Sequence, residues 1–552
     1  MNTYDVIIIG GGATGAGTAR DCSLRGLKVL LIERFDFTAG ATGRNHGLLH
    51  SGARYAVTDR ESATECIKEN MILRKVARHC VEDTGGLFIT LPDDDLDYQK
   101  KFVESCISAG IKAEVIDPAE ARKLEPSVNP DLIGAVKVPD GAVDPFRLTT
   151  ANIIDATRHG AEVLTYHEVI ELIKDAAGAV VGVIIRDSRN GSLSKAYSKL
   201  IINAAGIWGQ RIASMAGCTV NMFPAKGALL IFGHRINNMV INRCRKPANA
   251  DILVPGDTIC LIGTTSDRVP FETVDNMEVT TAEVDILMSE GAKLAPELAR
   301  TRILRAYAGV RPLVASDDDP SGRSISRGIV CLDHEIRDGV PGLITITGGK
   351  LMTYRLMAEW ATDMACKKLG NTNHCVTATQ PLPGSEPAEV RKQKRLKSWR
   401  RAKSHVIDIS TDQKAAEGRH GTMSRDINRN GADDEGLVCE CEQVSVAEVK
   451  YAITELHVHN LLNLRRRTRM GMGTCQGQLC ACRAAGILAE NDAENEGNPN
   501  PLAVSPQCAQ KQLDDLASFI NERWKGMSPV GWGETLEEVQ FMTWLYQGVA
   551  GL

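Results

Sequence analysis

The sequence predicts an α/β protein that carries a small helical domain and a helical tail toward its C-terminal end. Short apolar runs, such as Val6–Ile9, Val29–Ile32 and Leu200–Asn203, alternate with helical patterns over about the first 375 residues. Five of the 16 cysteines lie between Cys439 and Cys482. A chain of 552 residues is too long for one hydrophobic core, so we expect several domains.

The composition is that of an ordinary globular protein, with 43% apolar residues, 24% charged residues and a net charge of −5. This balance is too mild to indicate a nucleic-acid partner. The opening "MNTYDVIIIG" has no basic region and enters a buried strand at once, so we do not expect a signal peptide. The sequence contains no unbroken apolar run of 18 residues, so we do not expect a helix that spans a membrane. We therefore expect a soluble chain, or one that reaches a membrane only through a partner.

Changes in composition divide the chain into four parts. Residues 1–375 form one continuous α/β unit, and 376–436 are Pro-rich, then basic, then polar, which is typical of a connecting region that is partly helical and partly flexible. Residues 437–490 form a compact segment that contains the clustered cysteines. After a second polar stretch, residues 505–552 form a helical tail with one apolar stripe.

The first chemical motif is a cluster of glycines between two strands, in "DVIIIGGGATGAGTARDCSLRGLKVLLIER". Gly10, Gly12 and Gly15 fit G-x-G-x-x-G, in which the glycines allow a tight turn, a close approach to a pyrophosphate and close packing of the helix. The N–H groups at the start of that helix suit an anion. Glu33 ends the second strand, where a carboxylate accepts hydrogen bonds from ribose hydroxyls. The sequence therefore predicts a dinucleotide site.

The segment after Glu33, "RFDFTAGATGRNHGLLHSGARY", resembles the FAD-dependent oxidoreductases of the D-amino-acid oxidase type, as do "LIINAAGIW" and "LITITGGKLMTYRLMAEWATD". The resemblance implies FAD as cofactor and a Rossmann-type FAD domain interleaved with a mixed-sheet substrate domain. The positive end of the helix after Gly349 would face the flavin pyrimidine. Besides the glycine motif and Glu33, the resemblance implies cofactor contacts at Arg34, Thr42, Ala205, Gly206, Gly348, Gly349, Leu351 and Thr353.

Four further stretches narrow the resemblance: "HSGARYAVTDRESA", "YAGVRPLVASDDD", "SISRGIV" and "TGGKLMTYR" are similar to FAD-dependent glycerol-3-phosphate dehydrogenases. The likeness covers nearly the whole chain and is to the A subunits of the anaerobic, three-subunit form. It implies oxidation of sn-glycerol 3-phosphate to dihydroxyacetone phosphate by hydride transfer to flavin. It also implies a membrane-anchored iron–sulfur subunit that passes electrons to quinone, together with a second flavoprotein subunit. The chain would then lie in the cytoplasm, bound to the inner face of the cell membrane through a partner subunit.

Three arginines in glycine-adjacent or turn-adjacent stretches, Arg54, Arg311 and Arg327, are the candidate phosphate ligands. Brought together, they form a fork of donors suited to a phosphate dianion. Lys350 would add a point charge, and Tyr55 would hydrogen-bond the substrate. Taken singly, each arginine would more often be a surface charge or part of an internal ion pair.

The reaction requires the C2 hydroxyl to lose a proton while the C2 hydrogen leaves as hydride. His50 is the candidate base, because it lies four residues before Arg54 and its ordinary pKa is about 6.5. A histidine that only hydrogen-bonds the flavin is the open alternative. Some relatives carry a histidine shortly after the Lys-Gly of the segment that reads "PAKGALLIF" here, where this chain has Ala228 and Leu229.

The clustered cysteines follow the pattern C-x-C, then 33 residues, then C-x4-C. Zinc sites usually show C-x2-C, whereas four thiolates suit a [2Fe–2S] cluster. The segment resembles the iron–sulfur domain of bacterioferritin-associated ferredoxin. The expected ligands are Cys439, Cys441, Cys475 and Cys480, with Cys482 as the alternative to Cys480. Because a flavin takes two electrons at once and metal centres take one at a time, a cluster would connect the two.

Residues that flank the cysteines are expected to tune the cluster. Gly471, Gly473 and Gly477 would let backbone N–H groups approach the sulfurs, and Arg465–Arg467 with Arg469 would offset the anionic cluster and raise its potential. The alternative for these arginines is a solvated helix face.

Three other functions stay open from the sequence. "TGRNHGLLHSG" also resembles L-2-hydroxyglutarate oxidising enzymes, which favours a dehydrogenase of a 2-hydroxy acid or of an amine. An oxidase that makes peroxide is the second, and a non-catalytic electron-transfer subunit is the third. The number of convergent arginines separates a phosphate substrate from a 2-hydroxy acid, because a phosphate needs more donors than a single carboxylate.

The basic run Arg391–Lys403 is either a contact with anionic lipid or a solvated helix face.

Overall fold

The computed structural model describes most of the chain, namely residues 3–314, 328–386, 411–427, 434, 436–495, 497 and 504–549. Arg327 and the basic run 391–403 lie outside the described residues.

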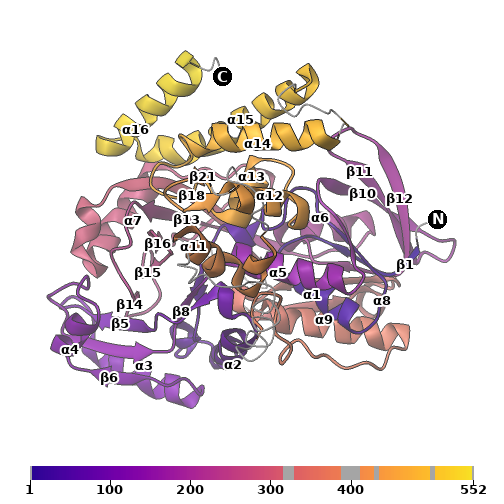
Figure 1. Cartoon of the computed structure of the whole chain (residues 1–552). Coiled ribbons are helices and arrows are strands. Elements are labelled where there is room, and N and C mark those ends of the chain that lie inside the picture. The colour runs from indigo at the N-terminus through magenta and orange to yellow at the C-terminus, as the bar shows by residue number, and fades with distance from the viewer. Residues whose placement is uncertain are drawn as a thin grey trace, which may run out of the picture.

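An eight-stranded sheet contains the glycine motif (Figure 1). Strand β1 (Thr3–Ile9) lies between β12 (Leu193–Asn203) and β2 (Val29–Ile32), and β20 (Leu343–Gly348) and β9 (Glu162–Leu164) extend the parallel part at either side. The antiparallel strands are β10 (His167–Lys174), β11 (Val180–Asp187) and β19 (Ile329–Asp333). The three apolar runs predicted as strands all belong to the parallel part.

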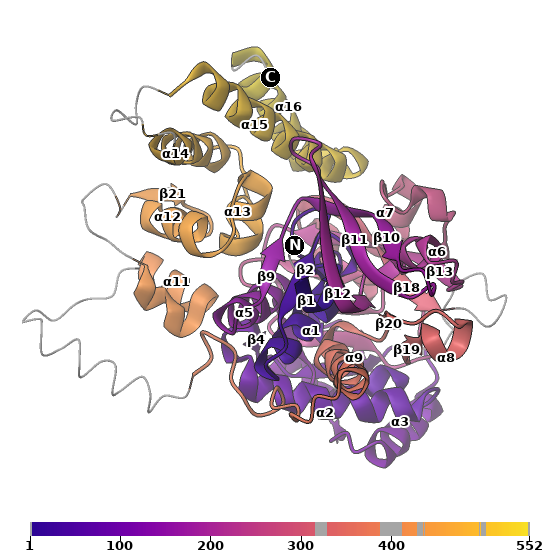
Figure 2. The same cartoon turned by 90° about the vertical axis from the view of Figure 1, so that its right-hand side faces the viewer.

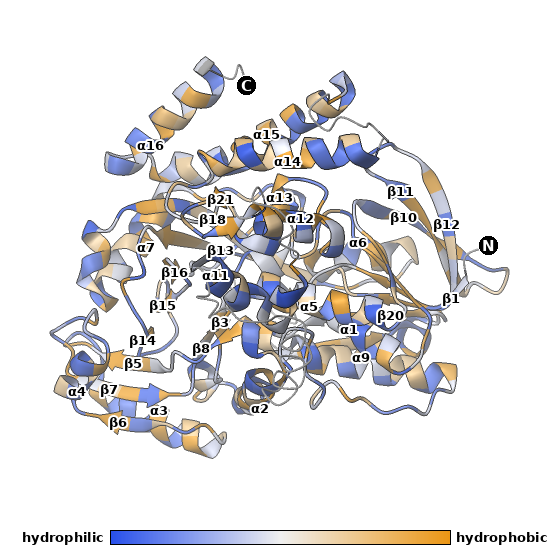
Figure 3. Cartoon of the chain, in the orientation of Figure 1, coloured by the Kyte–Doolittle hydropathy of each residue, from blue (hydrophilic) through white to orange (hydrophobic). Residues whose placement is uncertain are grey.

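Both faces of this sheet are covered, which explains why its strands read as continuous apolar runs. Val6 and Ile8 pack on α1, α5 and α9, whereas Ile7 and Ile9 pack into a second core with Val183 of β11. The helices on the first face are α1 (Ala13–Leu24), α5 (Pro145–Arg158) and α9 (Tyr354–Leu369). Orange strands lie in the interior of the molecule in the hydropathy colouring, whereas β10 and the first half of β12 carry polar residues (Figure 3).

A nine-stranded mixed sheet forms the second layer of the first unit. Its longest pairing joins β13 (Met222–Phe232) and β18 (Ile303–Val314), which run antiparallel over their whole length. The other strands are β5 (Gly86–Thr90), β6 (Glu114–Ile116), β7 (Gly134–Val138), β14 (Val240–Arg243), β15 (Ile252–Pro255), β16 (Cys260–Gly263) and β17 (Asp267–Arg268). The chain passes repeatedly between the two sheets, so the predicted interleaving is confirmed.

Shorter elements complete the first unit. A small sheet joins β3 (Leu48–Leu49), β8 (Gly141–Val143) and β4 (Val81–Glu82). The remaining helices are α2 (Arg60–Val76), α3 (Leu96–Ser108), α4 (Pro118–Leu124), α6 (Gly209–Met215), α7 (Thr281–Leu294) and α8 (His334–Asp338).

A separate helical module carries the clustered cysteines, and we call residues 411–495 the cysteine module. It contains α11 (Thr411–His420), β21 (Leu437–Cys439), β22 (Val444–Ser445), α12 (Val446–Glu455), α13 (Leu461–Thr468) and α14 (Cys480–Asn495). Helix α11 falls inside the predicted connecting region, yet Arg419 at its end forms a buried ion pair of 2.6 Å with Glu448 of α12. Part of that region therefore packs with the module.

The tail, α15 (Pro506–Met527) and α16 (Gly533–Thr543), docks on the cysteine module. Phe519 is fully buried and packs in one core with residues of α12–α14. The predicted apolar stripe of the tail comprises Leu536, Val539, Trp544 and Leu545. Val539 and Leu545 face this core, whereas Leu536 and Trp544 are exposed. Figures 1 and 2 show α15 and α16, in yellow, lying along one side of the molecule beside α14.

A buried ion pair fastens the cysteine module to the first unit. Arg467 Nη2 lies 2.5 Å from Asp36 Oδ1, and Arg466 Nη1 lies 2.8 Å from Asp36 Oδ2. Only 1% of the side chain of Asp36 is exposed. Burial alone would raise the pKa of Asp36, but the charges of Arg467 and Arg466 outweigh it and lower that pKa. Nearby, the amides of Asn460 and Asn463 donate to the hydroxyl of Tyr166.

Within the described ranges, no helix combines the length and the apolar composition needed to cross a bilayer.

We expect the substitution Asp36→Asn to destabilise the contact by about 3–5 kcal/mol, because it leaves two arginines beside a buried amide. The measurement is urea unfolding followed by the visible absorption of the cysteine module's cluster. Glu297→Gln, which breaks an exposed pair with Arg300, is the control and should cost less than about 1 kcal/mol. Because the pKa of Asp36 is lowered, the pair's contribution is full above about pH 4 and is lost only on further acidification. Equal effects of the two substitutions would contradict this account.

Candidate active site and cysteine centre

The glycine turn has the close packing that its motif predicts. Gly10 has φ of +113°, and a Cβ at this position would lie 2.6 Å from the carbonyl oxygen of Ala204. A Cβ at Gly15 would lie 1.9 Å from the carbonyl oxygen of Gly10. At Gly12, by contrast, the described residues leave the Cβ position open except for Thr42 Oγ1 at 3.1 Å. The turn therefore packs tightly on the protein side and is open where a pyrophosphate would approach.

The acid and the helix start complete the dinucleotide end of the site. Glu33 accepts hydrogen bonds from the backbone N–H groups of Gly11 (2.6 Å) and Phe35 (2.9 Å). At the N-terminus of α1, the N–H of Ala13 donates to Thr42 Oγ1 at 3.0 Å. Arg34 forms an ion pair of 2.5 Å with Asp275. These residues are rigidly placed around the motif.

A cavity of about 240 Å³ leads from this turn to the predicted substrate residues. Its walls come from the helix start, from the turn after β20, from β18 and from the short helix at Ala53–Tyr55. The structure thereby brings together five side chains from distant parts of the sequence: His50, Arg54, Tyr55, Arg311 and Lys350. The sixth predicted residue, Arg327, lies outside the described residues.

One terminal nitrogen of the Arg54 guanidinium is hydrogen-bonded, and the other has no partner among the described residues. Its Nη2 donates to Asp251 Oδ2 at 2.8 Å and to the carbonyl oxygen of Ala248 at 3.3 Å. Its Nη1 is buried and has no hydrogen-bond partner among the described residues. Burial would raise the pKa of Asp251, but the charges of Arg54 and Arg245 lower it, so this carboxylate stays ionised. The geometry suits a guanidinium that is fixed in place to receive an anion.

Arg311, on β18, is bound by neutral oxygens. It donates to the carbonyl oxygens of Lys226 at 3.2 Å and Thr265 at 3.0 Å, and to the hydroxyls of Ser266 and Thr264. None of these four acceptors carries a charge, and together they orient the guanidinium.

Lys350, Tyr55 and His50 form a row along the cavity. Lys350 Nζ lies 4.7 Å from the centre of the Tyr55 ring, and the rings of Tyr55 and His50 are 5.0 Å apart. The backbone N–H of Gly52 donates to His50 Nδ1 at 3.0 Å. A neutral imidazole with Nδ1 as acceptor carries its hydrogen on Nε2. Asp140 Oδ1 lies 3.9 Å from the same Nδ1.

Two successive glycines after β20 redirect the chain toward this cavity. Gly348 and Gly349 have φ of +76° and +64°, and a Cβ at Gly349 would lie 2.4 Å from Met357 Sδ. Thr353 Oγ1 accepts a hydrogen bond of 2.9 Å from the N–H of Lys350, and Leu351 lines the cavity. The positive end of α9 therefore faces the cavity.

Ala205 and Gly206 lie at the other end of the site. The N–H of Ala205 donates to Asn203 Oδ1 at 3.3 Å, and Gly206 has φ of +57°. Their turn follows Ala204, which packs on Gly10. They border the glycine turn and do not line the 240 Å³ cavity.

The four predicted ligand cysteines lie side by side in the cysteine module. Hydrogen-bond contacts link their thiols in the order Cys439, Cys480, Cys475 and Cys441. Contact with Cys441 and with Cys480 lowers the pKa of Cys475, although burial opposes this shift. Such a lowered pKa favours the thiolate, which is the form that binds a metal.

Backbone N–H groups surround these sulfurs. Cys439 receives hydrogen bonds from the backbone of Gly471 and Glu442, and Cys475 receives them from Gly477 and Gln478. Gly473 has another function, because a Cβ at this position would lie 2.4 Å from the Cβ of Cys441. The three glycines thus act in two ways: Gly471 and Gly477 present backbone N–H groups to the sulfurs, and Gly473 leaves room for Cys441.

Cys482 is set apart from the other four cysteines. It is exposed, and its contact is with the hydroxyl of Tyr546.

The spacing of the other four thiols differs from the spacing of sulfurs around a single zinc ion. Four tetrahedral sulfurs lie about 3.8 Å apart when the Zn–S bonds are about 2.3 Å long. Among the described residues, three metal-binding side chains with ligand atoms within 4.8 Å of one another occur at Cys218, His334 and Asp338, and not at these cysteines.

The arginines near the cysteines do not form a solvated helix face. Arg466 and Arg467 bind Asp36 of the first unit. Arg469 lies 2.9 Å from Glu442 and 3.1 Å from Asp257. These three side chains therefore connect the module to the first unit.

Two buried carboxylates of the site were not predicted from the sequence. Asp251 fixes Arg54, and Asp140 accepts a hydrogen bond of 2.7 Å from the N–H of Ser51, beside His50. Neither aspartate belongs to a spaced motif, so no sequence signal distinguishes it from an exposed acid.

Comparison with known proteins agrees with this geometry. Residues 5–355 match the family model described as FAD dependent oxidoreductase, and residues 437–490 match the BFD-like [2Fe-2S] binding domain. The chain is 60% identical over 549 residues to the A subunit of the anaerobic glycerol-3-phosphate dehydrogenase of Haemophilus influenzae, and the match covers 99% of this chain and 93% of that protein. The protein of the same name from Escherichia coli K12 is 60% identical over 550 residues, 99% and 97% of the two chains.

The chain belongs to the FAD-dependent oxidoreductases, in the family of anaerobic glycerol-3-phosphate dehydrogenase A subunits. FAD and a [2Fe–2S] cluster are its cofactors. The residues fit both groups, because the turn is open at Gly12 and four thiols converge in the module.

Solved structures show the same fold. The glycerol-3-phosphate dehydrogenase of Bacillus halodurans, complexed with FAD, aligns with a TM-score of 0.67 and 20% identity over 95% of each chain. The L-proline dehydrogenase of P. horikoshii aligns with a TM-score of 0.52 over 71% of this chain and 99% of that one.

We expect Gly15→Ala to lower the FAD content of the purified protein at least tenfold, because the new Cβ would overlap the carbonyl oxygen of Gly10. The measurement is flavin absorbance per chain after gel filtration. Gly486→Ala is the control, because a Cβ there would meet no atom within 4 Å. A Gly15→Ala protein with full FAD content would contradict the assigned function of this glycine.

Proposed function

We propose that this chain oxidises sn-glycerol 3-phosphate to dihydroxyacetone phosphate and passes the electrons to its cysteine module. The observation that carries the proposal is the convergence of Arg54, Arg311 and Lys350 on one cavity beside the dinucleotide turn. When bound, FAD accepts the C2 hydride and the [2Fe–2S] cluster takes up electrons singly.

The three cationic groups suit a phosphate better than a single carboxylate. Arg54 presents a buried Nη1 that has no partner among the described residues, and Arg311 is oriented by neutral oxygens. Asp251, which holds Arg54, is already shared with Arg245. A phosphate dianion offers more acceptor oxygens to these donors than a carboxylate monoanion does. Arg327 stays a prediction as a further phosphate ligand.

The tautomer of His50 decides what it does to the substrate hydroxyl. While Gly52 donates to Nδ1, the neutral ring presents a hydrogen at Nε2 and orients an oxygen atom. To remove a proton at Nε2, the ring must hold its hydrogen on Nδ1, on the side of Asp140. The base function of His50 therefore stays a prediction, and hydrogen bonding to flavin or substrate stays the alternative. Tyr55, between His50 and Lys350, is placed to hydrogen-bond the substrate.

The test is an anaerobic titration followed by the visible spectrum. Glycerol 3-phosphate should bleach the flavin band first and the cluster bands afterwards. Complete bleaching should take about 1.5 substrates per chain, because each substrate gives two electrons, FAD takes two and the cluster takes one. L-2-hydroxyglutarate and glycerol are the comparison substrates. Bleaching by L-2-hydroxyglutarate but not by glycerol 3-phosphate would favour a 2-hydroxy acid as substrate, and bleaching by neither would favour a non-catalytic subunit.

The proposed partners are a membrane-anchored iron–sulfur subunit that leads electrons to quinone, together with a second flavoprotein subunit. The relatives are named as one lettered subunit of an enzyme, which supports further subunits. The tail presents large apolar side chains to solvent, with Trp524, Trp532, Phe541 and Trp544 each 46–63% exposed. Such side chains are enriched in protein interfaces. With the membrane-anchored partner, the chain would lie on the inner, cytoplasmic face of the cell membrane.

We expect Arg54→Gln to lower kcat/KM for glycerol 3-phosphate about 10- to 100-fold, which corresponds to the loss of a charge-assisted hydrogen bond of ~1.5–3 kcal/mol. Oxidation of glycerol, which lacks the phosphate, should change little. The measurement is steady-state reduction of an artificial acceptor with both substrates. Arg60→Gln, at an exposed arginine of α2, is the control. An equal loss for both substrates would rule out phosphate binding by Arg54.

We expect His50→Ala nearly to abolish flavin reduction by substrate, because a positioned base contributes about 10²–10⁴-fold. Anaerobic stopped-flow absorbance measures this rate, and FAD content shows that the cofactor is retained. A variant within about threefold of the wild-type rate would rule out the base function.

We propose Cys439, Cys441, Cys475 and Cys480 as the cluster ligands. Cys480→Ser should abolish the EPR signal of the reduced cluster, because serine lacks the thiolate that iron requires. Cys482→Ser should keep two irons per chain, since this thiol contacts Tyr546 and not the other cysteines. The opposite pattern of iron contents would assign the fourth ligand to Cys482.

A further inference from the structure

Helix α15 of the tail reaches the cysteine centre, although it lies outside the matched [2Fe-2S] domain, which ends at residue 490. We call residues 469–479, between α13 and α14, the cysteine loop. Phe519 and Arg523 are four residues apart on α15, so they share one face of this helix. Both side chains are fully buried, and both contact the cysteine loop. The tail therefore supplies part of the surroundings of Cys475.

Phe519 occupies the space that two glycines of the cysteine loop leave open. A Cβ at Gly471 would lie 2.9 Å from the ring of Phe519, and a Cβ at Gly477 would lie 2.7 Å from the same ring. The backbone N–H groups of these two glycines donate to Cys439 and Cys475. The ring thus supports the two turns that present N–H groups to the sulfurs.

Arg523 binds the cysteine loop at two points. Its Nη2 donates to the carbonyl oxygen of Gly471 at 2.7 Å, and its Nη1 donates to Gln476 Oε1 at 3.0 Å. Gln476 in turn donates from its Nε2 to the carbonyl oxygen of Gly473 at 2.8 Å. One guanidinium therefore joins the segments of the loop before and after Cys475.

The positive charge of Arg523 is only partly balanced by carboxylates. The two atoms that accept its hydrogen bonds are neutral oxygens, and its Nε is buried without a partner among the described residues. The carboxylate of Glu522 acts on Arg523, but three other arginines share that carboxylate. A buried cation is costly unless an anion accompanies it.

The cysteine centre provides such an anion. Burial lowers the pKa of Arg523 most and Arg305 lowers it further, whereas Glu522, Cys480 and Cys475 act in the opposite direction. A guanidinium stays protonated in proteins, and the ligand thiolates of a [2Fe–2S] cluster carry negative charge. The thiolates that hold the cluster are therefore the counter-charge of Arg523.

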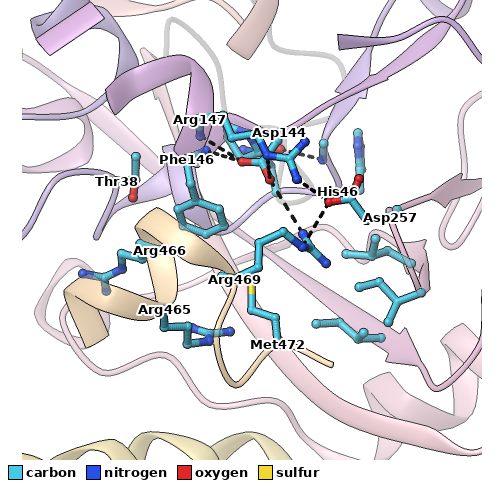
Figure 4. A pocket seen from close by; sticks show the side chains of 18 of the residues that line it. Thr38, His46, Asp144, Phe146, Arg147, Asp257, Arg465, Arg466, Arg469 and Met472 are labelled. Carbon is cyan, nitrogen blue, oxygen red and sulfur yellow. Dashed lines mark hydrogen bonds and ion pairs between the residues drawn. The ribbon is translucent and has the colours of Figure 1, made fainter. Parts of the chain in front are cut away.

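The arginines of the cysteine module are less available for this function. Three of the four that the sequence suggested as neighbours of the cluster bind carboxylates of the first unit. Figure 4 shows one of them, Arg469, reaching to Asp144 and Asp257 at a cavity of about 790 Å³ that both parts line. The fourth, Arg465, also lines this cavity. A cation that is paired with a carboxylate adds little to the potential at a nearby group.

We propose that Arg523 is a positioning residue of the [2Fe–2S] centre, which holds the cysteine loop through Gly471 and Gln476 and raises the reduction potential of the cluster by its charge. Reduction adds one negative charge to the cluster, and a nearby cation stabilises the reduced form. A higher potential makes the cluster a better acceptor for electrons from flavin. The inference rests on the proposed ligand cysteines and is independent of the substrate.

The test is a redox titration of the purified holoenzyme, in which the EPR signal of the reduced cluster is followed under argon. Arg523→Gln should make reduction of the cluster at least tenfold less favourable, which lowers the midpoint potential by at least ~59 mV for one electron. Arg523→Lys keeps the charge and should stay within about threefold of wild type, a shift below ~30 mV. Lys511→Gln, at an exposed lysine of the same helix, is the matched control and should leave the potential unchanged.

Iron content, measured on the same samples, separates the charge of Arg523 from its hydrogen bonds. Loss of iron in Arg523→Gln but not in Arg523→Lys would support the proposal, because only the lysine keeps a cation beside the anionic cluster. The proposal fails if Arg523→Gln retains both its iron and the wild-type potential, or if the two variants lose iron or shift the potential equally. A wild-type protein that holds two irons per chain keeps the proposed ligands separate from this outcome, since their own test is the iron content of Cys480→Ser.

Discussion

The buried contact of Asp36 with Arg466 and Arg467 determines how the two redox parts of this chain face each other. Asp36 lies three residues after Glu33, the predicted ribose-binding acid, and the arginines lie on the helix that leads to the cysteine loop. One carboxylate therefore connects the start of the cofactor-binding loop to the start of the cluster-binding loop. A buried pair of this kind contributes little net stability compared with apolar packing, but breaking it is costly, so it fixes one arrangement.

In this arrangement, the first unit and the cysteine module have different chemistry. The first unit collects cationic groups around a small cavity, where a phosphate and a hydroxyl can be positioned. The cysteine module collects four thiols and backbone N–H groups, where an anionic cluster can be held. Between them lies a cavity that borders both.

Much of the fold and part of the site could be predicted from the sequence. The turn at Gly10, Gly12 and Gly15 and the spacing of the cysteines are local patterns whose physical reasons hold without tertiary contacts, and the structure shows both as packed. The convergence of Arg54 and Arg311 was predictable only through resemblance to a family. Residues that lie so far apart in the sequence leave no periodic signal. The tautomer of His50 depends on a hydrogen bond from Gly52 that sequence does not reveal.

Contacts between distant segments set the limit of what the sequence reveals. Asp36 and Arg467 are 431 residues apart, and neither has a neighbour that identifies its partner. The arginines of α13 looked like a solvated face or a cluster environment, whereas in the structure Arg466 and Arg467 form the contact between two domains. In the same way, the importance of Asp251 comes only from its burial against Arg54, because an exposed aspartate at this position would leave the same sequence.

We expect electrons to pass from flavin to cluster within one chain, because the buried contact holds the two parts together. Stopped-flow mixing of the anaerobic protein with glycerol 3-phosphate, repeated over a hundredfold range of protein concentration, measures this transfer. The rate of cluster reduction should be first order and independent of protein concentration. A rate that rises in proportion to protein concentration would mean that electrons travel between molecules, which would contradict transfer within one chain.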